Sequence, residues 1–355
     1  MSGFRNQGSV IPRINGELRL DYSDILRTIR LTNISVERES DCHHHKFLVY
    51  VCDYSRSCGG LGDRQKGIVS AFLLAVATSR AFVINFETPC RIEKVFKQHL
   101  YNWSICRNFV NTISENETKL IDVMNQPTYK RPTKQVDFEL EWQSQVIFLK
   151  INSNWIKYLQ GRKEIKDHHS WLSEKPTVSI FSLILLTLFQ PTKYILDYFE
   201  HFHRYHVQGK SLVCSHIRMG KNPTIPNDKQ FEIKPNETVI FNFMQNFADP
   251  NKYVLYLASD SDYIRNEFYR KFDNSIKTNL SVQHIDILDK NLKRQACEGL
   301  KDAVIEQLTL SICDILLISH GGFGGNAAYL RGIDTNLYKY DFKSGRIKRK
   351  KLRHI

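Results

Sequence analysis

The chain has 355 residues, of which 42% are hydrophobic and 25% charged, as expected for a globular protein of one large or two ordinary domains. Lys and Arg outnumber Asp and Glu by 50 to 37, which gives a net charge of +13. This positive field attracts phosphates, nucleotides, nucleic acids or a membrane surface without choosing among them. The longest apolar run, Ile180–Phe189, is too short for a transmembrane helix, which needs roughly 20 residues. The first residues also lack the apolar core of a signal peptide.

The N-terminal part predicts a parallel βαβ unit that follows an irregular arm. Residues 1–45 are polar and are expected to form an arm or stem. A strand at Phe47–Cys52, a glycine-rich loop, a helix at Ile68–Thr78 and a strand at Ala81–Phe86 are expected next. The helix is apolar nearly all round, which is typical of a helix packed beneath a sheet. Two strands joined by a helix are expected to be parallel.

The middle of the chain predicts an insertion and two helices. Ile113–Phe138 is polar and contains prolines, which indicates an exposed insertion. The apolar patterns of Val178–Phe189 and Tyr194–His203 predict helices. Gly209 is interpreted as a hinge that closes an N-terminal domain over residues 46–208.

Beyond Gly209, strands alternate with helices, which indicates an α/β domain over residues 209–342 with a mostly parallel sheet. Residues 343–355 are expected to form a solvated basic tail. The predicted fold class is therefore α/β, with two Rossmann-like domains facing one another across a cleft. Strands are expected at Leu212–Ile217, Tyr253–Leu257, Val282–Ile285, Ile315–Ile318 and Leu337–Tyr340, and helices up to Phe272 and at Ala303–Cys313 and Asn326–Arg331.

Four unusual motifs each follow a predicted strand. They are Cys58–Gly67, Ser215–Gly220, Ala258–Asp262 and Ser319–Gly325. In open α/β sheets, ligands bind outside the carboxyl ends of the strands, so the motifs predict one shared binding site. Glycines let the backbone approach an anionic ligand, and the N–H groups at a helix N-terminus favour negative charge.

The side chains of the two central motifs suit a nucleotide. Arg218, beside His216, would project where its strand ends, so its guanidinium could grip a phosphate through two hydrogen bonds; a surface salt bridge is the alternative. Ser259, Asp260 and Asp262 stand at the start of a helix. One of them is expected to cap that helix, which leaves the others for ribose or base contacts.

The last motif, Ser319–Gly325, combines a hydroxyl, an imidazole and four glycines before a helix. This composition is expected to present backbone N–H donors to a diphosphate. A purely structural turn would not need so many glycines.

The cysteines and sequons bear on the compartment of the protein. Eight cysteines allow a set of disulfides without requiring one, and no C-x-x-C pair indicates a zinc ribbon or redox motif. The sequons slightly exceed the number expected by chance, which gives mild support to a secreted or lumenal context. They stand at Asn33, Asn102, Asn116, Asn236 and Asn279.

These motifs, in this order, resemble the GDP-fucose-dependent fucosyltransferase superfamily, which includes α1,2- and α1,6-fucosyltransferases and protein O-fucosyltransferases. Gly59-Gly-Leu-Gly-Asp-Arg64 is similar to the family's first glycine-rich loop. His216-Ile-Arg218 is similar to its His-x-Arg motif, whose arginine holds the nucleotide's phosphate. Ser259–Asp262 resembles its acidic segment near the guanosine, and Ser319–Gly325 resembles its hydroxyl-bearing phosphate loop.

The resemblance covers roughly residues 47–340 and implies a GT-B fold, an inverting mechanism, GDP-fucose as the donor, and no required metal or other cofactor. Asp260-Ser-Asp262 has the Asp-x-Asp spacing of a metal site, but the resemblance assigns it to the nucleoside. The residues that the resemblance assigns to GDP-fucose binding are Gly59, Gly60, Gly62, Arg64, His216, Arg218, Ser259, Asp260, Asp262, Ser319, His320, Gly321, Gly322, Phe323 and Gly324.

The expected catalytic residues are Arg218, which would stabilise the departing diphosphate, and a general base. Asp63 in the first loop and Asp228, ten residues after Arg218, are the two candidates for the base. The sequence departs from the family where Met219-Gly220 follow Arg218, because many members carry a second arginine there.

The acceptor is expected to be a glycan or glycoprotein, bound by the loops Ile113–Phe138 and Arg218–Asp228. A transferase that uses another nucleotide sugar and a non-catalytic sugar-nucleotide-binding protein are the alternatives. A nucleic-acid partner is not expected, because the dense basic run over residues 343–353 has no interleaved aromatics. Many family members carry an N-terminal anchor, and none is expected within this sequence. The expected location is the Golgi or ER lumen if an anchor or signal is missing from this sequence, and the cytoplasm otherwise.

Overall fold

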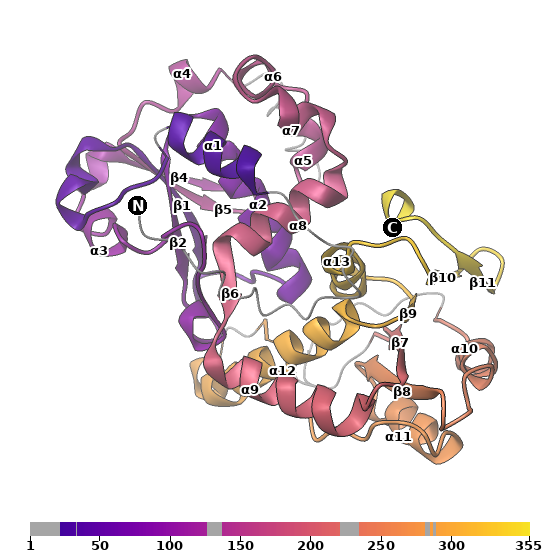
Figure 1. The fold of residues 1–355 in the computed structure, drawn as a ribbon. Coiled ribbons are helices and arrows are strands. Elements are labelled where there is room, and N and C mark those ends of the chain that lie inside the picture. Colours follow the sequence, from indigo (N-terminus) through magenta and orange to yellow (C-terminus); the bar gives the residue numbers. More distant parts are fainter. Residues whose placement is uncertain (1–21, 33, 126–136, 221–233, 281–284, 287–288) are drawn as a thin grey trace, which may run out of the picture.

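The structure is a computed structural model that describes residues 22–32, 34–125, 137–220, 234–280, 285–286 and 289–355. It contains two larger, mostly parallel sheets in separate parts of the molecule, as Figure 1 shows. We call the part around the first sheet the N-terminal lobe and the part around the second sheet the C-terminal lobe. The predicted α/β class with mostly parallel sheets is confirmed.

The sheet of the N-terminal lobe has the strand order β2-β1-β5-β4, and its neighbouring strands are parallel. The predicted strands β1 (Phe47–Cys52) and β2 (Ala81–Phe86) are confirmed. They pair from Phe47 with Ala81 onward, which confirms the parallel βαβ unit. All six residues of β1 are buried, as expected for a central strand covered on both faces.

The helix α2 (Leu61–Ala77) begins earlier than the sequence predicts, inside the glycine-rich loop. Gly60, in an extended conformation, is its N-cap residue. The polar first turns look like a loop in the sequence, yet Arg64 and Gln65 are buried, and hydrogen bonds to distant segments satisfy their polar groups. Apolar periodicity therefore could not show where the helix starts.

The described part of the N-terminal arm is ordered and packed, contrary to the irregular arm expected from its sequence. The helix α1 (Ser23–Leu31) buries Ile25 and Ile29 in the core of the N-terminal lobe. The 3₁₀ helix η1 (Glu39–His44) holds Cys42, which forms a disulfide with Cys106. Covalent and apolar contacts thus fix this segment to the lobe.

The predicted insertion Ile113–Phe138 contains a strand that the sequence does not reveal. β4 (Thr118–Asp122) pairs in parallel with β5 (Val146–Lys150) at the edge of the sheet. Within β4 only Ile121 is fully buried, so the apolar alternation of a strand is absent. The expected exposed insertion is wrong for this strand, and residues 126–136 lie outside the described residues.

The two predicted helices before the hinge are confirmed as α8 (Thr177–Leu188) and α9 (Lys193–Phe202). Ile195 of α9 packs in the core of the N-terminal lobe and Phe199 and Phe202 pack in the core of the C-terminal lobe, so α9 bridges the two lobes. The remaining short elements up to Gly209 are η2 (Ile92–Lys94), β3 (Phe96–Gln98), α3 (Arg107–Val110), η3 (Glu115–Glu117), α4 (Phe138–Glu141), α5 (Ile156–Leu159), α6 (Lys163–His168), α7 (Ser170–Glu174), β6 (Phe189–Pro191) and the π-helical turn η6 (His203–Val207).

The sheet of the C-terminal lobe has the order β11-β10-β9-β7-β8, and its strands are parallel except for the pair of β10 and β11. Its parallel strands lie near their predicted positions, and β9 has the predicted ends. Ile285 lies in a bend, and the rest of the expected strand Val282–Ile285 lies outside the described residues. The elements are β7 (Ser211–Ile217), α10 (Glu237–Gln245), β8 (Tyr253–Ser259), α11 (Asp262–Lys271), η7 (Lys290–Leu292), α12 (Lys293–Ser311), β9 (Ile315–Ile318), α13 (Gly322–Arg331), β10 (Leu337–Asp341), β11 (Arg346–Arg349) and η8 (Leu352–His354).

The basic C-terminal end is part of the fold rather than a solvated tail. β11 closes an antiparallel hairpin on β10, in which Lys348 pairs with Asp341. The Lys339 ammonium donates to the backbone oxygen of Ile355 over 3.2 Å. Basic side chains on an edge strand also discourage pairing with another chain, so the charge run has a structural use.

The two lobes are joined by helices and by a disulfide. α13 contacts both α2 and α8, and α12 contacts α2, so these helices lie between the two sheets (Figure 1). The disulfide Cys90–Cys297 ties the loop after β2 to α12. All eight cysteines are paired, the other two disulfides being Cys52–Cys58 and Cys214–Cys313. Among the described residues, none of the helices has both the length and the apolar character needed to cross a bilayer.

Candidate functional site

The carboxyl ends of β7 and β9 form the switch point of the C-terminal sheet, because β7 has β8 on one side and β9 on the other. His216 lies near the end of β7, Arg218 follows that strand, and Ser319 follows β9. The Arg218 N–H donates to the Ser319 hydroxyl over 2.9 Å, and the Ser319 N–H donates to the His216 carbonyl over 2.9 Å. Two of the four predicted motifs are therefore held together at the expected place.

The first glycine-rich motif reaches the same place from the N-terminal lobe. Gly62 in the first turn of α2 packs directly on the start of α13. A Cβ atom on Gly62 would lie 2.7 Å from the carbonyl carbon of Gly322 and 2.8 Å from the nitrogen of Phe323. The Asn326 amide donates to the Gly62 carbonyl and to Gln65 Oε1, both over 2.9 Å. The predicted meeting of the glycine loops is confirmed.

A cavity lies where these loops meet, and both lobes contribute to its walls. Lys66 and Asn154 come from the N-terminal lobe, and Lys339 comes from the C-terminal lobe with the loop Ser319–Gly322. At Gly321, with a φ of +95°, none of the described atoms would lie within 4 Å of an added Cβ, so the backbone is open there. The first N–H groups of a helix have no partner within the helix, and α13 begins at this loop. Two ammonium groups and a helix N-terminus make the cavity suitable for an anion.

Asp260 organises the turn that carries Arg218. Its carboxylate accepts hydrogen bonds from the Met219 N–H over 2.7 Å and from the Gly220 N–H over 2.9 Å. It also accepts a hydrogen bond from Arg218 Nη1, and the Arg218 side chain is 22% exposed. The guanidinium is thus held by a carboxylate while part of it stays accessible.

The residue that caps α11 differs from those expected in the acidic motif Ala258–Asp262. The cap of α11 is Ser261, whose hydroxyl accepts from the Ile264 N–H over 3.4 Å, so the prediction that Ser259, Asp260 or Asp262 caps the helix is wrong. Ser259 is buried at the end of β8, and Asp262 is exposed in the first turn of α11. Their contacts with a nucleoside stay predictions.

The His216 imidazole is buried beneath the N-terminus of α13. Its Nδ1 faces Gly324, where an added Cβ would lie 2.5 Å away, and its ring centroid is 5.4 Å from that of Phe323. Burial, followed by the positive charges of Arg218 and His320, lowers the pKa of His216 to about 3. The imidazole is therefore neutral at physiological pH and acts as a packing group rather than as a cation.

The buried His216 predicts a loss of stability in mild acid. Its pKa is about 3 in the folded chain against 6.5 for an ordinary histidine, so between these values only the unfolded chain binds a proton there. The free energy of unfolding should therefore fall as the pH falls from 6.5 toward 3. Urea denaturation across this range should give a shallower pH dependence for His216→Asn than for the wild type. Replacement of the exposed His43 is the control, and an unchanged slope in His216→Asn would contradict the assignment.

Arg64 is a buried cross-link between distant segments, so its guanidinium is already engaged by the protein. Nε donates to the Gly59 carbonyl over 2.8 Å, and the terminal nitrogens donate to the carbonyls of Thr88 and, over 3.2 Å, Ile285. Nη2 also lies 3.5 Å from Asp286 Oδ1. This geometry favours a positioning role, while the expected contact of Arg64 with the donor stays a prediction.

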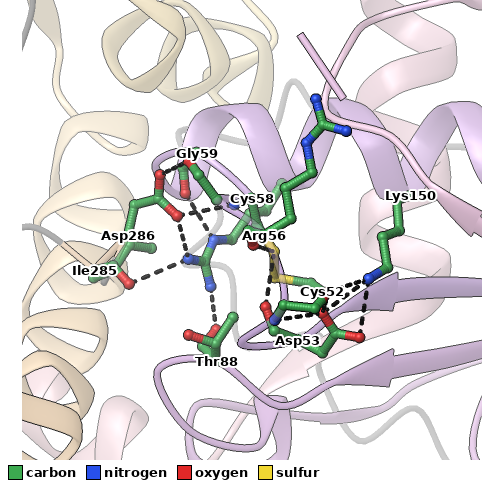
Figure 2. The surroundings of a disulfide bond; sticks show 12 residues. Cys52, Asp53, Arg56, Cys58, Gly59, Thr88, Lys150, Ile285 and Asp286 are labelled. Carbon is green, nitrogen blue, oxygen red and sulfur yellow. Dashed lines mark hydrogen bonds and ion pairs between the residues drawn. A yellow bond between two sulfur atoms is a disulfide. The ribbon is translucent and has the colours of Figure 1, made fainter. Parts of the chain in front are cut away.

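Asp286 is an important residue that the sequence analysis missed. Its carboxylate accepts from the Cys58 N–H over 2.9 Å and from the Ser57 hydroxyl, as Figure 2 shows for Cys58. Asp286 lies between α11 and α12, so a late segment of the chain fixes the entrance to Gly59 and Gly60. Asp286 directly follows the predicted strand Val282–Ile285, as the four motifs follow theirs, but the absence of glycine beside it left it unnoticed.

A second polar cluster lies at the carboxyl ends of the strands of the N-terminal sheet. The Lys150 ammonium contacts both carboxylate oxygens of Asp53, over 3.0 and 3.1 Å, at the ends of β5 and β1 (Figure 2). Arg56 forms an ion pair with Asp122 at the end of β4 over 2.7 Å. Burial raises the pKa of Asp53, but hydrogen bonds from Ser55 and Lys150 outweigh it and lower the pKa. This cluster holds the start of the loop that leads to α2.

Of the two candidate bases, the structure describes Asp63 but not Asp228. Asp63 lies in the first turn of α2 rather than at the tip of a loop, and its side chain is 44% exposed. It forms an ion pair with Lys66 over 3.1 Å and lies close to Gly322. Asp63 is therefore beside the cavity, and its role as a base stays a prediction. Asp228 lies outside the described residues.

Of the comparisons with known proteins, the one with solved structures bears on the fold. Neither the models of protein families nor the curated proteins contain a match to this sequence. Among solved structures, a mutant of Arabidopsis thaliana FUT1 in complex with GDP is similar over 97% of this chain and 78% of that chain, with a TM-score of 0.58 and 12% identity. NodZ α-1,6-fucosyltransferase soaked with GDP-fucose is similar over 86% of this chain and 98% of that chain, with a TM-score of 0.51 and 14% identity. The NodZ fucosyltransferase from Bradyrhizobium gives the same values.

The fold and the site together define a two-lobed α/β protein with a cavity suited to an anion where its glycine loops meet. The expected GT-B-like fold, with two Rossmann-like units, is confirmed by this likeness to fucosyltransferase structures.

Proposed function

We propose that the protein belongs to the GDP-fucose-dependent fucosyltransferase superfamily and transfers fucose from GDP-fucose to a hydroxyl of a glycan or glycoprotein. The observation that carries the proposal is the contact of Gly62 and of the Arg218 backbone with the loop Ser319–Gly325, which lines a cationic cavity. These segments are far apart in the sequence, and each resembles a donor-binding motif of the family. The similar folds of FUT1 bound to GDP and of NodZ soaked with GDP-fucose support the same assignment.

In the proposed reaction, the bond between the fucose anomeric carbon and the β-phosphate oxygen breaks as a bond to the acceptor oxygen forms on the opposite face. The electron pair of the broken bond passes to the diphosphate. Arg218 and the N–H groups at the start of α13 would stabilise that charge, which is the kind of contribution that usually dominates catalysis. The acceptor proton would pass to Asp63 or Asp228. The result is inversion, and the cationic groups of the protein would make a metal ion unnecessary.

The residues expected to bind GDP-fucose fall into groups according to their position around the cavity. Ser259 and Asp262 lie at the carboxyl end of β8, on the side expected for the guanosine. Asp260 would hold Arg218 in place. The residues expected around the diphosphate, on the first and last glycine loops and at the end of β7, are Gly59, Gly60, Gly62, Arg64, His216, Arg218, Ser319, His320, Gly321, Gly322, Phe323 and Gly324. Arg64 and His216 are buried, so they would support the loops from beneath.

The proposal is tested by calorimetric titration of nucleotides into the protein in the presence of a chelator. GDP and GDP-fucose should bind more tightly than UDP or UDP-sugars, because the base site is expected to suit guanine. Equal or tighter binding of a UDP-sugar would favour a transferase with another donor. If the folded protein bound none of these nucleotides, the proposed function would be contradicted.

We also propose that the protein works in the lumen of the secretory pathway. All eight cysteines form disulfides, which persist in oxidising compartments and are rare in the cytosol. The sequon residues Asn102, Asn116, Asn236 and Asn279 are all exposed, and Asn33 lies outside the described residues.

The exposed sequons predict N-glycans on protein expressed through a eukaryotic secretory pathway. Asn102 and Asn236 use Oδ1 as a hydrogen-bond acceptor, with Ser104 and with the first turn of α10, and a glycan attached through nitrogen leaves these bonds intact. Glycosidase treatment should lower the mass, and replacement of each sequon asparagine with glutamine should remove one glycan. The buried Asn152, outside any sequon, is the control. An unchanged mass after glycosidase treatment of secreted protein would contradict the prediction.

A further inference from the structure

The positive charge that Arg218 offers to a diphosphate is partly offset within the protein. Its Nη1 donates to Asp260, so a carboxylate stands beside the guanidinium. The next residues, Met219 and Gly220, add no charge. A nucleoside diphosphate carries several negative charges, so we expect a second cationic side chain to contribute to its binding.

Lys66 supplies a cation from the opposite lobe. It lies in the second turn of α2, and its ammonium stands over the start of α13, because a Cβ on Gly322 would lie 2.5 Å from Nζ. It lines the same cavity as Ser319 and Lys339. The lysine side chain is 26% exposed, so a ligand in the cavity can reach it.

The contacts of Lys66 leave room for a ligand. Its ammonium forms an ion pair with Asp63 over 3.1 Å, and an ammonium has three donors. The cavity that Lys66 lines also holds the start of α13 and the Lys339 ammonium, so the ligand that it suits is an anion.

We propose that Lys66 binds the β-phosphate of the nucleotide from the N-terminal lobe. The diphosphate would then be held by Arg218 and the start of α13 on one side and by Lys66 on the other. This inference rests on the proposed function for the identity of the nucleotide. It requires only that the cavity take a nucleoside diphosphate.

The test compares the binding of GDP and GMP to Lys66→Met by calorimetry. Loss of a charge-assisted contact should weaken GDP binding by roughly 10- to 100-fold and leave GMP binding within about threefold. Lys66→Arg, which keeps the charge, should recover part of the GDP affinity. Lys301→Met is a matched control, because Lys301 forms an i,i+3 pair with Glu298 over 2.8 Å at a similar exposure of 22%.

The outcomes separate the two proposals. Wild-type affinity for GDP in Lys66→Met, or an equal loss for GDP and GMP, would overturn the role of Lys66 while leaving the proposed function in place. If the wild type prefers UDP, and Lys66→Met loses UDP but not UMP, Lys66 keeps its role and the proposed donor is wrong. Circular dichroism of Lys66→Arg and Lys66→Met checks that both variants are folded.

Discussion

Replacing Arg218 with alanine is expected to lower kcat/KM for GDP-fucose by roughly 100- to 1,000-fold, the usual cost of removing a group that stabilises transition-state charge. The substitution removes the guanidinium. It also removes the positive partner of the Asp260 carboxylate, whose negative charge then stands near the diphosphate. GDP affinity, measured by calorimetry, should fall with the activity. The Met219 and Gly220 N–H groups still bind Asp260, so the turn should keep its shape.

Two further variants show whether the loss comes from the guanidinium itself. Arg218→Lys keeps the charge but not the planar fork, so it should recover only part of the affinity. Arg270→Ala is the control for a lost arginine, because Arg270 is 72% exposed and pairs with Glu267 away from the cavity. GDP affinity in Arg218→Ala equal to that of the wild type would place the diphosphate elsewhere.

Gly62→Ala is expected to damage both stability and nucleotide binding, although it adds a single methyl group. Its Cβ would lie 2.7 Å from the backbone carbon of Gly322 and 2.8 Å from the nitrogen of Phe323. Backbone atoms cannot rotate away as a side chain can, so the two glycine loops must separate. Overpacking of this kind costs about 1–3 kcal/mol in the free energy of unfolding. The separation should also weaken GDP binding, because the loops form the cavity.

Gly325→Ala is a control with the same chemical change. Its Cβ would meet Ile355 Cγ2 at 3.5 Å, an ordinary contact. Alanine is favoured over glycine in a helix by up to about 1 kcal/mol, so this variant should be neutral or slightly more stable. Urea denaturation of both variants tests the effect on stability, and GDP titration of Gly62→Ala tests the effect on binding. Equal effects of the two substitutions would show that the contact between Gly62 and α13 is not tight.

The sequence predicts the strands well where they are central in a sheet. Phe47–Cys52 and Ile315–Ile318 are apolar runs of strand length, and both are strands with those ends. β4 could not be predicted in the same way, since only Ile121 is buried at this edge of the sheet. Apolar patterning reports burial, and an edge strand with one buried residue has no pattern to show.

The glycine motifs predict the place of the site but not the start of the helices. Both α2 and α13 begin inside the glycine-rich segments, at Leu61 and Gly322, rather than after them. Glycine disfavours helices, so composition argues against the observed starts. Glycines are needed there because the close approach of Gly62 to Gly322 leaves no room for side chains.

The contacts between distant segments could not be predicted from the sequence. Asp286 binds the loop around Cys58, and Cys90 pairs with Cys297, over separations of 228 and 207 residues. Neither contact has a local signal, because each depends on the tertiary arrangement of the chain. The same holds for Lys66, whose proposed role comes from its position over α13.

The measurement that tests the central claim most directly is a transfer assay with radiolabelled GDP-fucose, a chelator and a panel of glycans and glycoproteins. We expect fucose to be transferred to a hydroxyl with GDP released, and NMR of the product to show an anomeric configuration opposite to that of the donor. Binding of GDP without transfer or hydrolysis by the folded protein would indicate a sugar-nucleotide-binding protein. Transfer only from a different nucleotide sugar, or with retained configuration, would contradict the proposed reaction.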